Sequence, residues 1–87
     1  MHYVYILQCA DQSLYVGETR DVVARVLMHQ AGEASGFTRQ RLPVTLVYAE
    51  EHPDRRRALG RERQLKRWTR AKKEALVTGD LSLLKRL

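Results

Sequence analysis

A short run near the amino terminus limits the folds open to this chain more than any other feature. Residues 3–9 read Tyr-Val-Tyr-Ile-Leu-Gln-Cys. β-Branched and aromatic residues therefore occupy both the odd and the even positions of the run, which point to opposite faces of a strand. Such a run is typical of a β-strand that is buried on both faces. The next residues, 10–13, are polar and turn-like, and 14–17 form a second short apolar run. We therefore expect an antiparallel hairpin.

The middle of the chain predicts a helix, a loop and a third strand. Thr19 and Asp21 both offer N-cap oxygens ahead of valines at helical spacing, which predicts a helix over about 21–31. The small, polar segment 32–36 is expected to be a loop, and the β-branched run 44–49 a strand. The apolar stripe of the helix is expected to comprise Val22, Val23 and Val26.

The rest of the chain predicts helices. Pro53 and the acid after it suit a first helical turn, so we expect a helix over about 53–68. Thr69 and Asp80 can cap two further helices. The 87 residues suit a single domain covering 1–87. The predicted fold is an α/β (α+β) sandwich with a small antiparallel or mixed sheet and the order ββαβαα(α).

The charge of the chain is positive and concentrated in one segment. Sixteen Lys and Arg residues oppose ten Asp and Glu residues, which gives a net charge of +6 with His neutral. Ten of the sixteen lie within 55–73, where Glu62 is the only acid. A clustered excess of this kind favours a polyanionic partner such as nucleic acid.

The single cysteine and the amino-terminal residues indicate which cellular compartment the sequence favours. Cys9 is the only cysteine, so an internal disulfide and a zinc site built from thiolates are both excluded. A single reduced cysteine fits the cytoplasm. The first residues carry no basic segment, and their apolar run is too short for a signal peptide or a membrane span.

Glu62 is the residue whose position most asks for an explanation. On a helical wheel of about 100° per residue it falls inside the apolar stripe of its helix. That stripe is defined by Ala58, Leu59 and Leu65. A carboxylate facing the body of the protein needs a cation, a metal or a set of donors, because an unpaired buried charge is costly. A salt bridge to an arginine and a metal role have equal weight at this point.

Four other residues suit ordinary structural roles when each is taken alone. Arg25 and His29 lie one turn apart on the first predicted helix, where a solvated arginine and a core or surface histidine are common. Tyr5 and Tyr15 lie on the two strands of the hairpin, where tyrosines usually pack into the core.

Together these residues form an ordered series of motifs. The series comprises Tyr3-Val4-Tyr5, then Leu14-Tyr15-Val16-Gly17-Glu18-Thr19, then Arg25-x-x-x-His29, and finally Glu62-x-x-x-Lys66-x-Trp68. This order and spacing resembles the GIY-YIG nuclease superfamily, and in particular its small stand-alone bacterial members. The resemblance covers the chain from Tyr3 to about Val77. It implies a central three-stranded antiparallel sheet flanked by helices, with the two name-giving motifs on adjacent strands. Tyr3 replaces the first glycine of the name motif, and Val4 and Val16 replace isoleucines.

The resemblance also implies an activity, which is metal-dependent endonuclease cleavage of nucleic acid. Glu62 would bind one Mg²⁺ or Mn²⁺, and water and phosphate oxygens would fill most of the ion's other positions. Arg25 would hold a phosphate oxygen, and Tyr15 would act as general base or orient the attacking water. Tyr5 and His29 would hydrogen-bond the phosphate or the nucleophile network. Which of the two tyrosines and the histidine handles the proton is open.

The basic segment is expected to follow the phosphate backbone. Its residues predicted to contact nucleic acid are Arg61, Lys66, Arg67, Arg70, Lys72 and Lys73. For Trp68 a half-buried structural role is favoured over stacking on a base. Glu18, an acid beside the second motif, leaves the affinity for substrate open. The resemblance favours DNA over RNA, in repair or recombination.

Two other functions remain open on the sequence. A non-catalytic nucleic-acid-binding module would keep the fold and the basic surface without cleavage. A homodimerising protein would use the same surface for another acidic partner. The sequence leaves both a monomer and a homodimer open.

Overall fold

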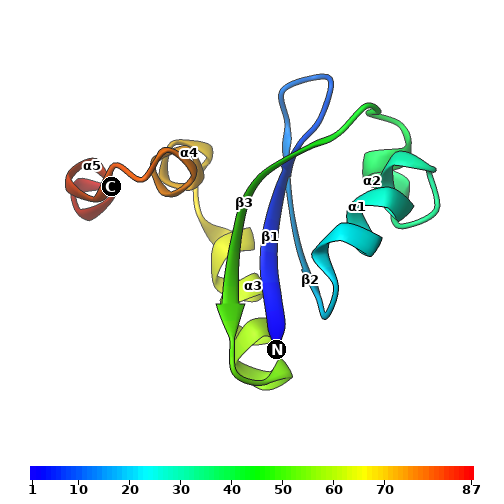
Figure 1. Ribbon diagram of the computed structural model, residues 1–87. Coiled ribbons are helices and arrows are strands. Elements are labelled where there is room, and N and C mark those ends of the chain that lie inside the picture. The colour runs from blue at the N-terminus through cyan, green and yellow to red at the C-terminus, as the bar shows by residue number, and fades with distance from the viewer.

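The fold is built around a small antiparallel sheet (Figure 1). A computed structural model describes residues 1–87 and contains the strands β1 (His2–Gln8), β2 (Leu14–Thr19) and β3 (Thr45–His52). The strand order is β2-β1-β3, so the first strand of the chain is the central one. As its sequence predicts, β1 is buried on both faces. Its fully buried residues are Val4, Tyr5, Ile6 and Leu7.

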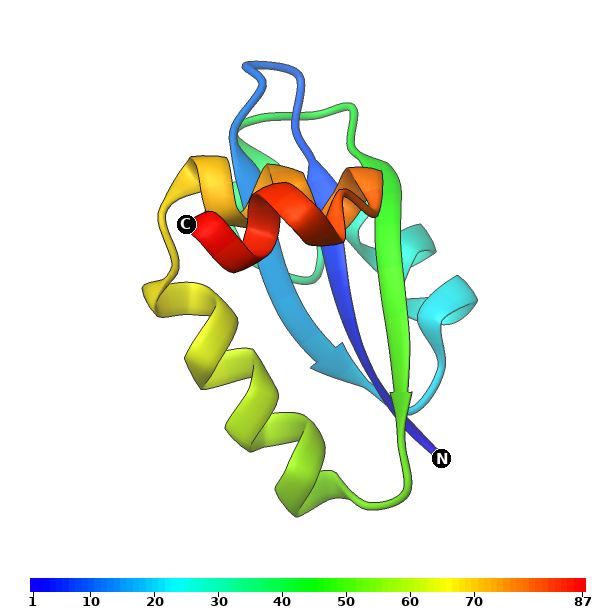
Figure 2. The ribbon, with the colours of Figure 1, turned by 90° about the vertical axis from the view of Figure 1, so that its left-hand side faces the viewer.

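Helices cover the sheet on both sides. On one side lie α1 (Val22–Gln30) and α2 (Gly36–Arg39), and on the other lie α3 (Arg55–Arg67) and α4 (Arg70–Thr78) (Figure 1). The last helix, α5 (Leu81–Arg86), packs against α4, and both cross in front of the strands in Figure 2. The α+β sandwich is thus confirmed, with a three-stranded antiparallel sheet. No helix combines the length and the apolar character that crossing a membrane requires.

Successive side chains along each strand point to opposite faces of the sheet, and this divides the core into two clusters. One faces α3 and comprises Val4, Ile6, Val16, Ala58 and Leu65. The other faces α1 and comprises Tyr5, Leu7, Cys9 and Val44. Trp68 packs on the first cluster, and Tyr15 and Val26 pack on the second. Both tyrosines of the predicted site therefore belong to the face of the sheet that carries α1.

The predicted caps begin the helices, with one adjustment. Asp21, Thr69 and Asp80 each accept a hydrogen bond from a backbone N–H of the following turn. Asp54 does the same for α3, so this helix begins at Arg55 and not in the turn that contains Pro53. A short side-chain oxygen at the N-cap, from an aspartate or a threonine, satisfies an otherwise unpaired donor, which explains why these helices begin where they do.

One helix was not predicted. The loop expected over 32–36 ends in the four-residue α2, which is capped by the Ser35 side chain accepting from the backbone N–H of Thr38. A single turn has no apolar periodicity by which to recognise it. The observed order is therefore ββααβααα, the predicted order with α2 added.

Two further expectations were wrong in detail. Val23 is 72% exposed, so it does not belong to the buried stripe of α1. The inward face carries Val22, Arg25, Val26 and His29. Because two of these four residues are polar, the apolar residues alone do not mark the buried face of the helix. The strand predicted over 44–49 continues to His52. Its polar end pairs with residues 2–4 of β1, and this pairing outweighs the weak strand propensity of its acids.

Gly17 is required by a close approach between strands. It lies opposite Tyr5 in the β1–β2 ladder, and a Cβ added at Gly17 would lie only 2.5 Å from Cζ of Tyr5. We expect Gly17→Ala to lower the free energy of unfolding by about 1–3 kcal/mol, because the Tyr5 ring must leave its buried position. Urea denaturation measures this change.

Gly60→Ala is the matched control, because a Cβ at Gly60 would meet nothing within 4 Å. Gly60 lies inside α3, where Ala is favoured over Gly by about 0.5–1 kcal/mol, so this variant should be more stable than wild type. A Gly17→Ala protein as stable as wild type would show that the contact with Tyr5 does not constrain this position.

Candidate active site

A buried pair of polar side chains lies at the centre of the predicted site. Tyr5 and His29 are each 1% exposed, and Tyr5 Oη lies 2.8 Å from His29 Nε2. Tyr5 comes from the central strand and His29 from the inward face of α1. Because both side chains are buried and bonded to each other, neither is free to contact a phosphate from solvent.

Thr38 completes this buried group, and it was not predicted as a site residue. Its Oγ1 lies 2.8 Å from His29 Nδ1 and also donates to the backbone carbonyl of Ser35 at 3.4 Å. A hydroxyl that gives its proton to a carbonyl accepts from Nδ1–H, which leaves Nε2 to accept from the Tyr5 hydroxyl. The hydrogen bonds therefore run in one direction, from Tyr5 through His29 and Thr38 to Ser35. Only the tertiary fold brings α2 to His29, so no local pattern in the sequence indicates this role.

Burial also fixes the protonation of the pair. Burial raises the pKa of Tyr5 to about 12, with further increases from Tyr15 and Glu62, while Arg25 lowers it. Burial lowers the pKa of His29 below its ordinary value, and the positive charge of Arg25 lowers it further. At neutral pH Tyr5 is thus a protonated donor and His29 a neutral acceptor.

Tyr15 is the aromatic residue of the site that remains partly accessible. It is half-buried, and its ring centroid lies 5.1 Å from that of His29 and 6.4 Å from that of Tyr5. The ring of Phe37 stacks beside it at 6.0 Å. Tyr15 therefore rests on the buried pair and reaches solvent from the edge strand β2.

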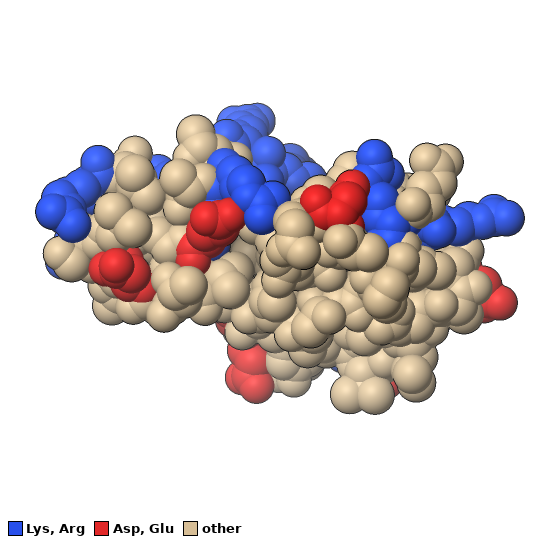
Figure 3. Space-filling model, turned by 90° about the horizontal axis from the view of Figure 1, so that it is seen from above, with Lys and Arg blue, Asp and Glu red and all other residues tan.

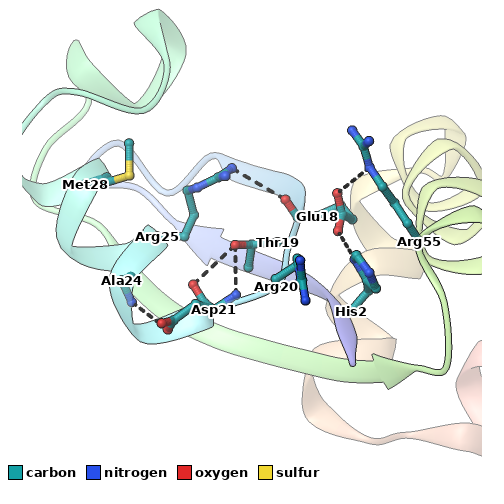
Figure 4. A pocket seen from close by; sticks show the side chains of 9 residues that line it. All are labelled: His2, Glu18, Thr19, Arg20, Asp21, Ala24, Arg25, Met28 and Arg55. Carbon is teal, nitrogen blue, oxygen red and sulfur yellow. Dashed lines mark hydrogen bonds and ion pairs between the residues drawn. The ribbon is translucent and has the colours of Figure 1, made fainter.

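Arg25 lines the largest cleft of the molecule, which has a volume of about 510 Å³ (Figure 4). Its guanidinium donates to the backbone carbonyl of Glu18 at 3.5 Å. The Glu18 carboxylate is bound by His2 at 3.0 Å and by Arg55 at 3.9 Å. Figure 4 shows His2 and Arg55 converging on Glu18, and the positive charge of Arg55 partly offsets the negative charge that this acid brings to the cleft. Arg20 lines the same cleft.

Glu62 approaches the site from α3, on the other face of the sheet. Its side chain is 16% exposed, and its one ion-pair partner is Lys66, whose Nζ lies 3.3 Å away. Its charge raises the pKa of Tyr5, so the carboxylate lies within electrostatic reach of the buried pair. A carboxylate can accept about four hydrogen bonds or ligand contacts, and one exposed lysine leaves most of that capacity free. The salt bridge and a metal role are therefore compatible.

The predicted nucleic-acid-binding residues differ in how strongly the protein holds them. Arg61 is bound to Glu50 at 3.1 Å, and its guanidinium lies 5.1 Å from the ring centroid of Trp68, which is half-buried as expected. Burial alone would raise the pKa of Glu50, but hydrogen bonds from Tyr48 and Arg61 help to hold it below its usual value. This geometry favours a structural role for Arg61.

The other basic residues are more available. Lys66 pairs with Glu62, and Arg70 pairs with Glu74 in an exposed contact of the kind that contributes little stability. Three of the six predicted residues form no ion pair, and these are Arg67, Lys72 and Lys73. Lys72 Nζ lies 4.6 Å from the ring centroid of Trp68. Seen from above, Lys and Arg side chains gather along one long edge of the molecule, with acids interspersed (Figure 3).

The role of Thr38 can be tested without any substrate. We expect Thr38→Val to lower the free energy of unfolding by about 1–3 kcal/mol, because it leaves the buried Nδ1–H of His29 without an acceptor. Thr38→Ser retains the hydroxyl and should recover most of this loss. Urea denaturation measures stability, and ¹⁵N shifts of the His29 ring report the tautomer. A Thr38→Val protein with unchanged stability and tautomer would contradict this role.

Comparison with known proteins gives a consistent result. Residues 1–75 match the family described as the GIY-YIG catalytic domain. A UPF0213 protein of Streptococcus sanguinis (strain SK36) is 51% identical over 75 residues, which are 86% of each chain. A UPF0213 protein of Haloquadratum walsbyi is 52% identical over 76 residues, which cover 87% of this chain and 85% of the relative.

A solved structure shares the fold as well. The solution NMR structure of a UPF0213 protein from Bacillus halodurans is 43% identical, with a TM-score of 0.58. The match covers 88% of this chain and 82% of that one. Motif order, sheet topology and these relatives agree, and the chain belongs to the GIY-YIG nuclease superfamily.

Proposed function

We propose that this protein is an endonuclease that hydrolyses phosphodiester bonds of nucleic acid with the help of one divalent metal ion. The proposal is supported by three groups that come from three elements. Tyr15 of β2 packs on the buried Tyr5–His29 pair, and the charges of Arg25 from α1 and Glu62 from α3 both act on Tyr5. A base or water-orienting group, a cation and a carboxylate are what this hydrolysis requires.

Each accessible residue has a role that follows from its chemistry. Arg25 would bind a non-bridging phosphate oxygen, since it lines the large cleft and forms no ion pair with a carboxylate. Tyr15 would orient the attacking water, because it is the partly exposed tyrosine of the site.

Tyr5 and His29 would act as positioning residues. A pKa of about 12 keeps Tyr5 protonated at neutral pH, and its proton is directed to His29. The pair would therefore hold the Tyr15 ring and the Arg25 side chain in place without receiving the proton of the water.

The residues around Glu62 suit a mostly hydrated ion. No group of three or more His, Cys, Asp or Glu side chains is arranged to hold a metal, so Glu62 would be the one protein ligand. Mg²⁺ keeps several water ligands and tolerates such a site. When bound, Mg²⁺ or Mn²⁺ would supply charge stabilisation to the phosphoryl oxygens.

The proposed substrate is DNA, and the proposed setting is repair or recombination in the cytoplasm. The basic residues of segment 55–73 would provide sequence-independent contacts to phosphates. We assign no side chain of the site to hydrogen bonding with base edges. We therefore propose selectivity for the structure of the nucleic acid and not for its sequence.

The experiment is a cleavage assay on labelled single-stranded, duplex, flap and branched DNA and on RNA, each with Mg²⁺, Mn²⁺ or EDTA. We expect cleavage with metal, none with EDTA, and strongly reduced cleavage by Tyr15→Phe with unchanged binding. Salt-sensitive binding without cleavage of any substrate would instead favour a non-catalytic nucleic-acid-binding module.

A further inference from the structure

A second cleft lies beside Tyr15 and shares no lining residue with the cleft of Arg25. It has a volume of about 210 Å³ and is formed where β2, α2, α3 and α4 meet. Its lining combines an apolar floor with two cations and contains no acid. The lining residues are Leu14, Tyr15, Val16, Phe37, Lys66 and Lys73.

The aromatic wall of this cleft is held in place from behind. Phe37 stacks on Tyr15, yet it remains 40% exposed. The guanidinium of Arg41 lies 3.9 Å from the Phe37 ring centroid and is itself fixed by Asp11 and by the Phe37 carbonyl. An exposed ring that the protein orients in this way is suited to contact a flat ligand.

The two cations of the cleft differ in their surroundings. Lys66 contacts Glu62, which places it between this cleft and the proposed catalytic carboxylate. Lys73 forms no ion pair. A flat apolar surface beside the ammonium group of Lys73, which no carboxylate pairs with, matches one ligand class, a nucleotide, whose base is flat and whose phosphate is anionic.

We propose that this cleft binds the nucleotide next to the scissile phosphate, with its base against Phe37 and its phosphate at Lys73. The inference rests on the proposed function, since it takes the scissile phosphate to lie at Tyr15. A base within a duplex is stacked on both faces and paired at its edge, so only an unpaired nucleotide can enter. The site therefore selects nucleic acid that is single-stranded at this position.

Binding measured in EDTA tests the proposal without cleavage. Fluorescence anisotropy would compare a single-stranded oligonucleotide with the same sequence as a blunt duplex. We expect Phe37→Ala to weaken binding of the single strand about tenfold and to change duplex binding little, as for loss of one stacked base. Lys73→Ala should reduce the slope of log binding constant against log salt concentration by about 1, as expected for the loss of one phosphate contact. Lys85→Ala, on α5, is the matched control and should have no effect.

A second measurement leaves the protein unchanged, so misfolding of a variant cannot obscure the result. Single abasic sites are placed along the strand, and one position should weaken binding to wild type as much as Phe37→Ala does. Equal affinity for every abasic position, together with wild-type affinity of Phe37→Ala, would overturn the proposal. If this pattern of binding appears but Mg²⁺ gives no cleavage, the nucleotide site is supported and the proposed endonuclease activity fails. If wild type cleaves DNA in Mg²⁺ but neither Phe37→Ala nor an abasic site at any position alters binding, the endonuclease activity is supported and the nucleotide site fails.

Discussion

Glu62→Gln is expected to lower the rate of metal-dependent cleavage by at least about a thousandfold, a loss of about 4 kcal/mol of transition-state stabilisation. Gln has nearly the same shape as Glu but carries no negative charge, so it is a poor ligand for Mg²⁺. The negative charge of Glu62 contributes to the raised pKa of Tyr5, so this carboxylate acts on the buried site. The effect should appear in single-turnover cleavage, with unchanged binding of the substrate.

Lys66→Ala is the control for this change. It removes the ion-pair partner of Glu62 without removing the carboxylate. Because Lys66 also lines the nucleotide cleft, binding of DNA should weaken, but the single-turnover rate at which bound DNA is cleaved should persist. The Lys66 side chain is itself exposed, so the fold should change little. If Lys66→Ala and Glu62→Gln reduced cleavage equally, the ion pair and not metal binding would explain the need for Glu62.

Arg25→Ala is expected to lower the cleavage rate by about 10²–10³-fold, the usual cost of removing a group that stabilises developing charge. Arg25→Lys should recover only part of this loss, because an ammonium group lacks the planar fork of a guanidinium. The same substitution has a second readout in the protein alone. Because the charge of Arg25 lowers the pKa of His29, Arg25→Ala should raise that pKa in an NMR titration.

Arg20→Ala is the matched control for Arg25, because Arg20 lines the same cleft and is exposed. Arg20→Ala should weaken binding of DNA slightly through the lost charge. It should leave the rate at which bound DNA is cleaved unchanged. Wild-type cleavage by Arg25→Ala, or an equal loss with Arg20→Ala, would remove Arg25 from the proposed chemistry. An unchanged His29 pKa would contradict its electrostatic contact with the buried pair.

Much of the fold follows from local signals. The buried strand, the hairpin and the N-caps Asp21, Thr69 and Asp80 are predictable because neighbouring residues determine them. The short helix α2 is not, because one turn depends on a cap and on packing and has no periodicity. Val23 was misplaced because the inward face of α1 carries two polar residues, Arg25 and His29.

The candidate site was predictable in its members but not in their arrangement. The motif series names Tyr5 and His29, yet only the structure places both out of solvent and bonds them to each other. Thr38 contacts His29 across nine residues of chain, through a helix that the sequence does not reveal. Arg61 looks like any other residue of the basic segment until Glu50, on a neighbouring strand, is seen to bind it.

The most direct test of the proposed activity is a cleavage time course of labelled DNA with wild type and Glu62→Gln side by side, in Mg²⁺ and in EDTA. Wild type should generate product in Mg²⁺ alone, and Glu62→Gln should generate none in either condition while binding the DNA equally well. Product formed by both proteins at the same rate in Mg²⁺ would contradict catalysis at Glu62.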